Sequence, residues 1–185
     1  MAQFGFHFDM TSCVACKTCQ IACNDKNDLK VGEIYRKVRR SEGGKYPNPW
    51  IYYLSMSCNH CEDPKCVTNC PTGASYKSAE DGRVAIDQSK CIGCQYCVWS
   101  CPYEARVYHK DSGTVGKCDM CADLIQKGEK PACVDACFMR ALHFGEIEEL
   151  KKQYGGVQDL EILPSSDITK PAVLITAKPI AKRRV

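Results

Sequence analysis

Short runs that alternate hydrophobic and polar residues recur along the chain, and each predicts a short β-strand. Five runs carry this pattern: residues 4–8, 75–77, 84–86, 106–109 and 142–144. Only residues 146–154 show a longer helical period, with Ile147, Leu150 and Tyr154 on one face and a glycine pair after them. The pattern therefore predicts small strands, loops and brief helices.

Residues 24–57 interrupt this pattern. A turn-rich stretch at 41–49 separates two β-prone arms, 34–40 and 50–56, and predicts a hairpin or a long loop. The run 36–40 is basic, which is typical of a solvated face or of a contact with a partner protein.

The C-terminal part has a different composition. Residues 162–185 contain three prolines and no helical period, although residues 170–176 are compatible with a strand. The end carries the basic residues Lys182, Arg183 and Arg184. Two alternatives remain open for this tail: a disordered basic segment, or an extended arm lying on a partner subunit.

Sixteen cysteines stand between the strand-like runs, in four groups of four that each close with a C-x₃-C step. The groups are Cys13, Cys16, Cys19 and Cys23; Cys58, Cys61, Cys66 and Cys70; Cys91, Cys94, Cys97 and Cys101; and Cys118, Cys121, Cys133 and Cys137. The third group, followed by Pro102, is the bacterial ferredoxin run C-x₂-C-x₂-C-x₃-C-P. Sixteen thiolates are enough for four [4Fe–4S] clusters.

Disulfides and zinc are the alternatives to iron and sulfur. Residues 1–12 lack the basic and apolar regions of a signal peptide, and three thiols at two-residue intervals suit one metal centre better than distant disulfide partners. Zinc needs two C-x₂-C pairs, but it does not explain a third Cys in the loop and a fourth after three residues. The spacing therefore favours iron–sulfur clusters.

The flanks of the four groups repeat as strand, cysteine loop, short helix and strand, so two groups make one ferredoxin-like module. Groups two and three are separated by only residues 71–90 and predict an inner module at 58–102. Groups one and four then pair across it. The prediction is an α+β fold with a discontinuous outer module at 1–35 and 103–155, a hairpin or loop insertion at 36–57 and an extended tail at 156–185.

The charge balance changes once clusters are counted. Sixteen thiolates and four cluster cores would take the formal charge from +3 to about −5, so the sequence gives no argument for nucleic-acid binding. No run of about 18 apolar residues predicts a membrane span. No catalytic triad, phosphate loop or dinucleotide motif is discernible, and the chain is predicted not to be an enzyme by itself.

Three segments, 52–66, 91–103 and 117–133, resemble the iron–sulfur subunit of the bacterial dimethyl sulfoxide reductase family of molybdopterin oxidoreductases. The resemblance implies four [4Fe–4S] clusters that connect a large molybdenum-bis(pterin guanine dinucleotide) catalytic subunit with a polytopic membrane anchor that exchanges electrons with quinol. It also implies a peripheral location, on the extracytoplasmic side if the chain is exported with the catalytic subunit, with the cytoplasmic face as the alternative.

The resemblance implies crosswise ligation, in which the last Cys of each group joins the cluster of another group. The implied ligand sets are Cys13, Cys16, Cys19 and Cys137; Cys58, Cys61, Cys66 and Cys101; Cys70, Cys91, Cys94 and Cys97; and Cys23, Cys118, Cys121 and Cys133. Nitrate-reductase relatives have Trp at the position of Cys94, so the Cys here implies a fourth four-iron cluster. Trp99 is expected to be a packing residue.

Other roles stay open at this point. A freely diffusing polyferredoxin, a zinc-bound scaffold, and the same relay in a formate-dehydrogenase-like enzyme or in a polysulfide or tetrathionate reductase are the alternatives. His60 lies between two predicted ligands, where a hydrogen bond to sulfur would tune a cluster. His7, His109 and His143 are expected to be surface or packed residues of strands.

Overall fold

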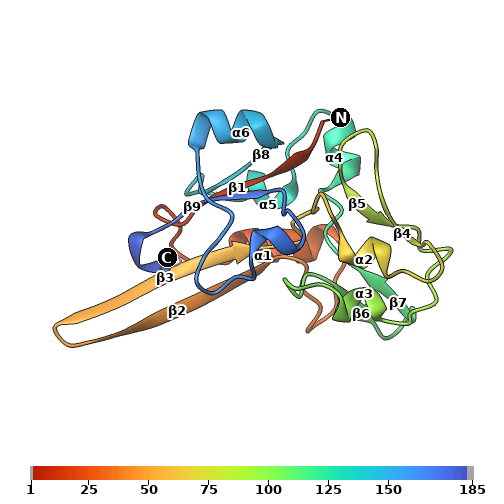
Figure 1. Ribbon diagram of the computed structural model, residues 1–185, viewed down its shortest axis with the longest axis horizontal. Helices are drawn as coiled ribbons and strands as arrows, with labels where there is room; N and C mark the ends of the chain where they lie inside the picture. Colours follow the sequence, from red (N-terminus) through yellow and green to blue (C-terminus); the bar gives the residue numbers. More distant parts are fainter. Residues whose placement is uncertain (1, 183–185) are drawn as a thin grey trace.

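The computed structural model describes residues 2–182, so the expectation for Arg183 and Arg184 lies outside the described residues. The α+β class is confirmed, and a three-stranded sheet of order β8-β1-β9 forms one layer of it (Figure 1). The central strand β1 (Phe4–Asp9) runs antiparallel to β8 (Leu142–Glu146) and parallel to β9 (Val173–Thr176). Helix α6 (Ile147–Tyr154) contacts all three strands.

The alternation of β1 explains its burial on both faces. Phe6 and Phe8 lie in the large apolar core, whereas His7 points the other way and stacks on Tyr154 of α6, with ring centroids 4.7 Å apart. Ile147 and Leu150 of α6 pack on this second face with Leu174 of β9. The predicted apolar face of the helix is therefore confirmed.

The described residues also contain three two-stranded sheets. They pair β2 (Lys37–Lys45) with β3 (Asn48–Met56), β4 (Ser75–Lys77) with β5 (Val84–Ile86), and β6 (Val107–His109) with β7 (Thr114–Gly116). Short helices precede the last Cys of three groups: α2 (Lys65–Thr68), α3 (Tyr96–Trp99) and α5 (Ala132–Asp135). Strand β7 and the additional helix α4 (Ala122–Gln126) were not predicted from the sequence.

Helix α1 (Thr18–Lys26) differs from these because it contains Cys23 and continues for three residues beyond it. It packs beside α5, and this contact brings the first and last cysteine groups together. Two 3₁₀ helices, η1 (Ser166–Ile168) and η2 (Pro179–Ala181), complete the C-terminal part.

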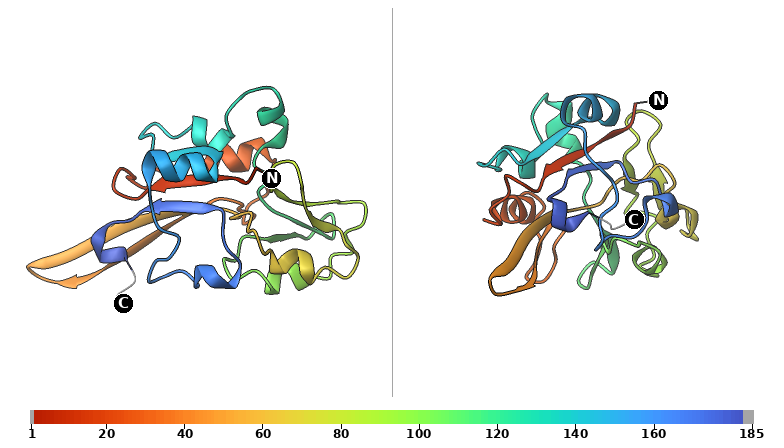
Figure 2. Two further views of the ribbon diagram at one scale, coloured as in Figure 1. Left: turned by 45° about the horizontal axis from the view of Figure 1, so that its top comes forward. Right: turned by 60° about the vertical axis from the view of Figure 1, so that its left-hand side comes forward.

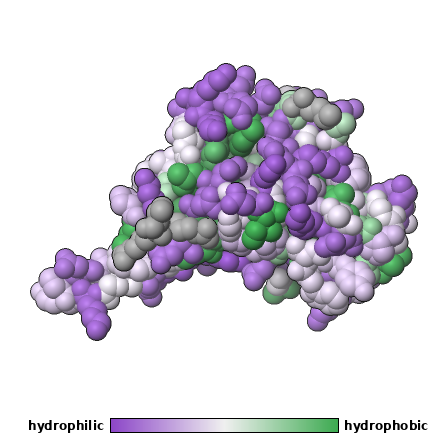
Figure 3. All heavy atoms as spheres, in the orientation of Figure 1, coloured by the Kyte–Doolittle hydropathy of each residue, from purple (hydrophilic) through white to green (hydrophobic). Residues whose placement is uncertain are grey.

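The hairpin of β2 and β3 projects from the body of the molecule (Figures 1 and 2), and its end is hydrophilic on the face that Figure 3 shows. The predicted hairpin is confirmed, but its turn is shorter than the turn-rich stretch 41–49, because β2 continues to Lys45 and β3 begins at Asn48. Gly43 is a strand residue opposite Trp50, whose indole occupies the space that a Cβ would need. This glycine therefore makes room for a cross-strand aromatic ring rather than a turn.

The C-terminal segment is extended, but it packs on its own chain. Val157 forms a bridge with Ile175, and Leu160, Ile175 and Ala181 are fully buried. The alternative of a disordered tail is therefore wrong for residues 156–182, where β9 lies on β1, and the contact of the end of the tail with a partner subunit stays a prediction. The physical reason is that β9 pairs with the free edge of β1 and buries Val173, together with Ile175, in the core.

The two-stranded sheets β4–β5 and β6–β7 lie at the opposite end of the molecule from β1, β8 and β9 (Figure 2). There β7 contacts the residues predicted as the inner module, since Gln88 Nε2 donates a hydrogen bond to the Val115 carbonyl (3.1 Å). Residues 107–116, predicted as part of the outer module, thus lie against the inner one. Across residues 2–182, no helix has both the length and the apolar character needed to traverse a bilayer.

Candidate metal centres

Four thiols gather at the end of β1. The loop after the strand carries Cys13 and Cys16, Cys19 lies in the first turn of α1, and Cys137 follows the end of α5; all four line one small cavity. Ala15 and Lys17 have left-handed backbone conformations, with φ of 57° and 63°. These turns wrap the loop around the cavity, so that three thiols from seven residues point toward the same space.

A second foursome lies between α1 and the α4–α5 region. Burial raises the pKa of Cys23 to about 12, with the neighbouring Cys133 and Cys121 thiols as further causes. Burial, Cys23 and Cys133 likewise raise the pKa of Cys118. Cys23, Cys118, Cys121 and Cys133 therefore lie together.

The other two foursomes occupy the opposite end. Burial, and then Cys58, Cys66 and Cys101, raise the pKa of Cys61 to about 12, so these four thiols are neighbours. A second cavity is lined by Cys70, Cys91, Cys94 and Cys97. The Gly93 backbone, with φ +65°, passes so close to Gly113 that a side chain there would collide with the Gly113 carbonyl.

In each foursome, one thiol comes from a group distant in sequence. Short helices bring Cys70 and Cys101 to each other's groups and Cys137 to the first group, while α1 brings Cys23 to the fourth. These are the same foursomes that the resemblance implied, and their ligation of clusters stays a prediction. Within the described part of the chain, no three His, Cys, Asp or Glu side chains are placed to share a single metal ion.

The comparisons with known proteins agree with this chemistry. Residues 50–147 match the 4Fe-4S dicluster domain family. The chain is 44% identical to the B subunit of anaerobic dimethyl sulfoxide reductase from Escherichia coli (strain K12), over 98% of this chain and 91% of that protein. The chain belongs to this family of iron–sulfur subunits.

Two further relatives widen the family. The B subunit of anaerobic dimethyl sulfoxide reductase from Haemophilus influenzae is 42% identical, over 98% of this chain and 93% of the relative. The thiosulfate reductase electron transfer subunit of Salmonella typhi is 38% identical, over 82% of this chain and 80% of the relative. The resemblance found from the sequence is confirmed, and the chain is an electron-transfer subunit rather than a catalytic one.

The residues around the thiols fit iron–sulfur clusters. Cysteine thiolates are the ligands of such clusters, and the family carries them. Several buried polar atoms of residues near the thiols lack a hydrogen-bond partner among residues 2–182: Arg36 Nε, His60 Nε2, and Arg106 Nε and Nη1. Buried donors without a partner are costly, and the sulfur atoms of a cluster are acceptors for them.

Burial also determines the protonation of the free thiols. A pKa raised to about 12 by burial favours the protonated thiol at Cys23 and Cys61 at neutral pH. Cluster ligands are thiolates, so assembly has to release these protons. The free energy of iron–thiolate bonding compensates for burying the charge.

Three buried cations surround the thiols, and their burial was not predicted from the sequence. The first, Arg36, belongs to the run 36–40 that was expected to be a solvated face or a partner contact; this is wrong for Arg36, which is 2% exposed. The others are Arg106 and Lys117, at 4% and 6% exposure. Lys117 directly precedes a ligand-spaced Cys, which was the only signal available in the sequence.

The histidines and Trp99 also have defined surroundings. His60 Nδ1 accepts a hydrogen bond from the Val84 N–H (3.1 Å), and burial lowers the pKa of His60, with Lys117 as the next cause; its proton therefore lies on Nε2. His109 contacts Tyr35 and Glu33, and His143 stacks on Tyr154. The expectation that Trp99 is a packing residue is wrong, because its side chain is 72% exposed.

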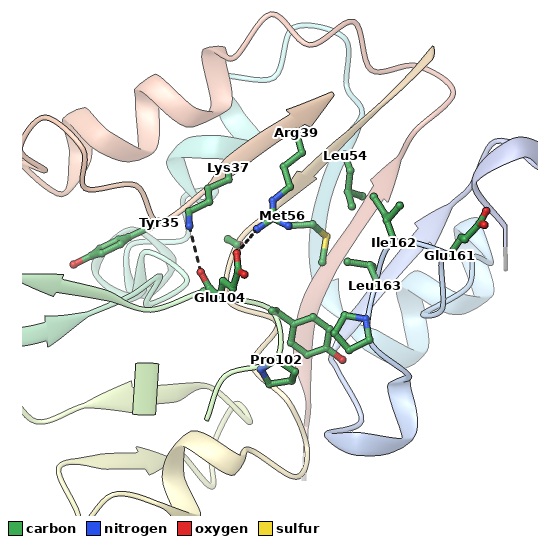
Figure 4. Close-up of a pocket in the computed structure, with 14 residues that line it drawn as sticks. Tyr35, Lys37, Arg39, Leu54, Met56, Pro102, Glu104, Glu161, Ile162 and Leu163 are labelled. Atoms are coloured by element: carbon green, nitrogen blue, oxygen red, sulfur yellow. Dashed lines mark hydrogen bonds and ion pairs between the residues drawn. The ribbon is translucent and has the colours of Figure 1, made fainter. Parts of the chain in front are cut away.

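A separate cavity of about 290 Å³ lies between the hairpin, the loop after Cys101 and residues 161–164 (Figure 4). Arg39 and Glu104 form an ion pair on its wall (2.9 Å), and Lys37 Nζ donates to the Glu104 carbonyl (3.4 Å). No thiol lines it. These contacts fasten the base of the hairpin to the cysteine-rich region.

Proposed function

We propose that the chain relays electrons through four [4Fe–4S] clusters between a quinol- or quinone-linked membrane anchor and a molybdenum–pterin catalytic subunit of an anaerobic reductase of the dimethyl sulfoxide reductase type. The gathering of all sixteen thiols into four foursomes carries this proposal. Among the relatives, the B subunit of dimethyl sulfoxide reductase supports the class of reductase.

The proposed ligand sets are called sites 1 to 4. Site 1 is Cys13, Cys16, Cys19 and Cys137; site 2 is Cys58, Cys61, Cys66 and Cys101; site 3 is Cys70, Cys91, Cys94 and Cys97; site 4 is Cys23, Cys118, Cys121 and Cys133. Clusters bound there accept and release single electrons, while the chain fixes their positions and shields them from water.

Electrostatic effects between thiols of different foursomes support a single row of sites. Cys133 lies close enough to Cys19 to raise its pKa after burial, which links sites 1 and 4. Cys58 acts in the same way on Cys118, linking sites 4 and 2. Cys66 acts on Cys97, linking sites 2 and 3. The order 1–4–2–3 follows.

Exposed apolar side chains lie beside the thiols at both ends of this row. At site 1 the neighbours Val14 and Phe138 are 51% and 61% exposed, and at site 3 Ile92 is 67% exposed. Apolar surface beside a terminal redox site suits a protein partner. The proposed catalytic subunit and membrane anchor would each cover one end, which makes the chain peripheral to the membrane; export with the catalytic subunit stays a prediction.

The first test counts metal. The purified chain should contain about sixteen iron and sixteen acid-labile sulfide per molecule. Cys94→Ala should lose or convert the cluster of site 3 and keep the other three, because one iron loses its thiolate. The matched control Trp99→Phe changes an exposed neighbour and should keep all four, as followed by electron paramagnetic resonance.

Other outcomes would identify the alternatives. Four intact cubane signals in Cys94→Ala would contradict the ligand sets, and iron near eight in the unaltered chain would contradict the four-cluster relay. Zinc without sulfide would indicate a zinc scaffold. Stable co-purification with a molybdenum subunit would exclude a freely diffusing polyferredoxin.

A further inference from the structure

We propose that three buried cations, Arg36, Lys117 and Arg106, lie at the three junctions of the row and hold the reduction potentials of the flanking sites up. The inference rests on the proposed ligand sets and goes beyond them, because it assigns a role to residues that bind no iron. One cation serves each junction: Arg36 between sites 1 and 4, Lys117 between sites 4 and 2, and Arg106 between sites 2 and 3.

Arg36 occupies the first junction. Its Nη1 donates to Ser55 Oγ and to the Ser55 carbonyl (both 3.3 Å), Nη2 donates to Ser57 Oγ (3.0 Å), and the guanidinium lies over the Phe6 ring at 4.9 Å. Ser55 Oγ in turn lies 3.4 Å from Cys19 Sγ of site 1, and, against the opposing effect of burial, the Cys133 and Cys118 thiols of site 4 raise the pKa of Arg36. The charge therefore faces both sites.

Lys117 occupies the second junction. Its ammonium donates to the carbonyls of Cys118 (2.6 Å) and Val84, which hold it at the boundary between β5 and the site 4 loop. It acts on the Cys118 thiol of site 4 and on the Cys66 thiol of site 2. It is thus the cation between the two ends of the molecule.

Arg106 occupies the third junction. Its Nη2 donates to Ser75 Oγ (2.7 Å), and, against the opposing effect of burial, the Cys66 and Cys58 thiols of site 2 and the Cys97 thiol of site 3 raise the pKa of the guanidinium. It also lines the cavity that the site 3 thiols share. Its Nε and Nη1 have no partner of ordinary hydrogen-bond length within residues 2–182.

None of the three cations forms an ion pair with a carboxylate in the described part of the chain, although exposed cations such as Arg39 and Arg40 do. An unpaired buried charge is strongly unfavourable. Four thiolates around a doubly positive core leave each loaded site with about two negative charges, which compensate for these cations. Three buried cations that lie between thiol sets and form no ion pair with a carboxylate therefore point to the negatively charged clusters as their partners.

The expected effect has a definite sign. Reduction adds one negative charge to a site, and a nearby cation in a low-dielectric interior stabilises that charge. Removing the cation should lower the reduction potentials of the two flanking sites and change those of the remaining two much less. Each of the three substitutions should therefore give a different pair of shifted sites.

The experiment is redox titration of the full chain, monitored by electron paramagnetic resonance, for Arg36→Met, Lys117→Met and Arg106→Met. We expect the reduction equilibrium of both flanking sites to fall about tenfold, or about 59 mV for one electron. Arg106→Lys and Arg36→Lys keep the charge, so their reduction potentials should stay close to those of the unaltered chain. The surface variants Arg40→Gln and Lys152→Gln remove exposed charges and serve as controls.

Three results would overturn the proposal. The first is four loaded clusters with unchanged potentials in the Met variants. The second is an equal shift of all four sites, or one that the surface controls match. The third is loss of clusters from both the Met and the Lys variants, which would show that the site needs the shape of arginine and not its charge. Iron content of the unaltered chain tests the ligand sets separately.

Discussion

The two ends of the molecule are stabilised by different means. At the sheet end, β1, β8 and β9 bury large apolar side chains such as Phe8, Leu142 and Ile175. At the other end, around α2, α3 and the sheets β4–β5 and β6–β7, the buried apolar residues besides cysteine are mostly small: Ala74, Val84, Ala105 and Val115, with Tyr35 against His109 as the large one. Buried polar residues, including His60 and Arg106, take up much of the remaining interior.

This difference indicates how each end depends on its cofactor. Large apolar side chains contribute roughly 1.5–3 kcal/mol each when buried, so the sheet end has a core of its own. The other end has few such residues and keeps cations that need a negative partner. A small fold without a sufficient apolar core commonly depends on bound metal for its stability. If the proposed ligand sets hold, loading sites 2 and 3 is therefore expected to be part of folding that end.

Removal of iron should give the largest effect and separate the two ends. We expect amide hydrogens of β4, β5, α2 and α3 to lose their protection in the chelator-treated full chain, because no apolar core holds them. Amides of β1 and β8 should retain more of theirs. Hydrogen exchange of loaded and stripped protein measures this, and equal loss of protection at both ends would contradict the comparison.

The sequence predicted the sheet end and the cysteine end unequally well. Strands around the thiols followed from short alternating runs and from the repeat of the flanks. The strand register around Gly43 could not be predicted in this way. A glycine in a turn and a glycine opposite a large aromatic ring look alike in the sequence until the pairing of Gly43 with Trp50 is known. The docking of β9 on β1 depends on a contact between residues about 170 positions apart, which no local pattern encodes.

For the candidate sites, too, local patterns were predictable from the sequence and contacts between distant residues were not. Cysteine spacing predicted the chemistry, and resemblance supplied the crosswise sets. The buried state of Arg36 was not predictable, because basic runs are usually solvated and its neighbours Arg39 and Arg40 do pair with surface acids. A charged residue is buried only where distant elements provide its partners, here Ser55, Ser57 and the thiols.

A smaller effect should come from a glycine that lets the C-terminal segment approach the sheet. A Cβ on Gly5 would collide with the Ala172 carbonyl oxygen, whereas a Cβ on Gly145, its partner in β8, would meet only Leu150 at an ordinary 3.6 Å. Gly5→Ala should therefore cost about 1–3 kcal/mol of unfolding free energy, as overpacking does. Urea unfolding measures it.

Gly145→Ala is the matched control for this substitution and should change stability far less. Iron content should stay the same in both variants, because the collision lies at the sheet end and away from the thiols. Equal stability of the two alanine variants would mean that residues 172–176 adjust without loss, and that β9 adds little to the core it covers.

The smallest effect concerns acid. His7 is almost fully buried, bonded through Nε2 to Thr176 Oγ1 (2.9 Å), and burial followed by the nearby His143 lowers its pKa from 6.5 to about 4. Between these two pH values the unfolded chain binds the proton and the folded chain does not, so stability rises with pH in that window. The contribution is complete above about pH 6.5 and is lost as pH falls toward 4.

His7→Gln removes this titration, so the midpoint of urea unfolding should fall less between pH 7 and pH 5 than in the unaltered chain. Its stability at pH 7 is lower as well, since the stack on Tyr154 is lost, but the slope with pH is the diagnostic quantity. Lys152→Gln, on the exposed face of α6, should keep the full slope. His7→Gln could instead lose as much stability between pH 7 and pH 5 as the unaltered chain does. The groups that make the fold acid-sensitive would then lie at the thiol-rich end, and His7 at the sheet end would not contribute.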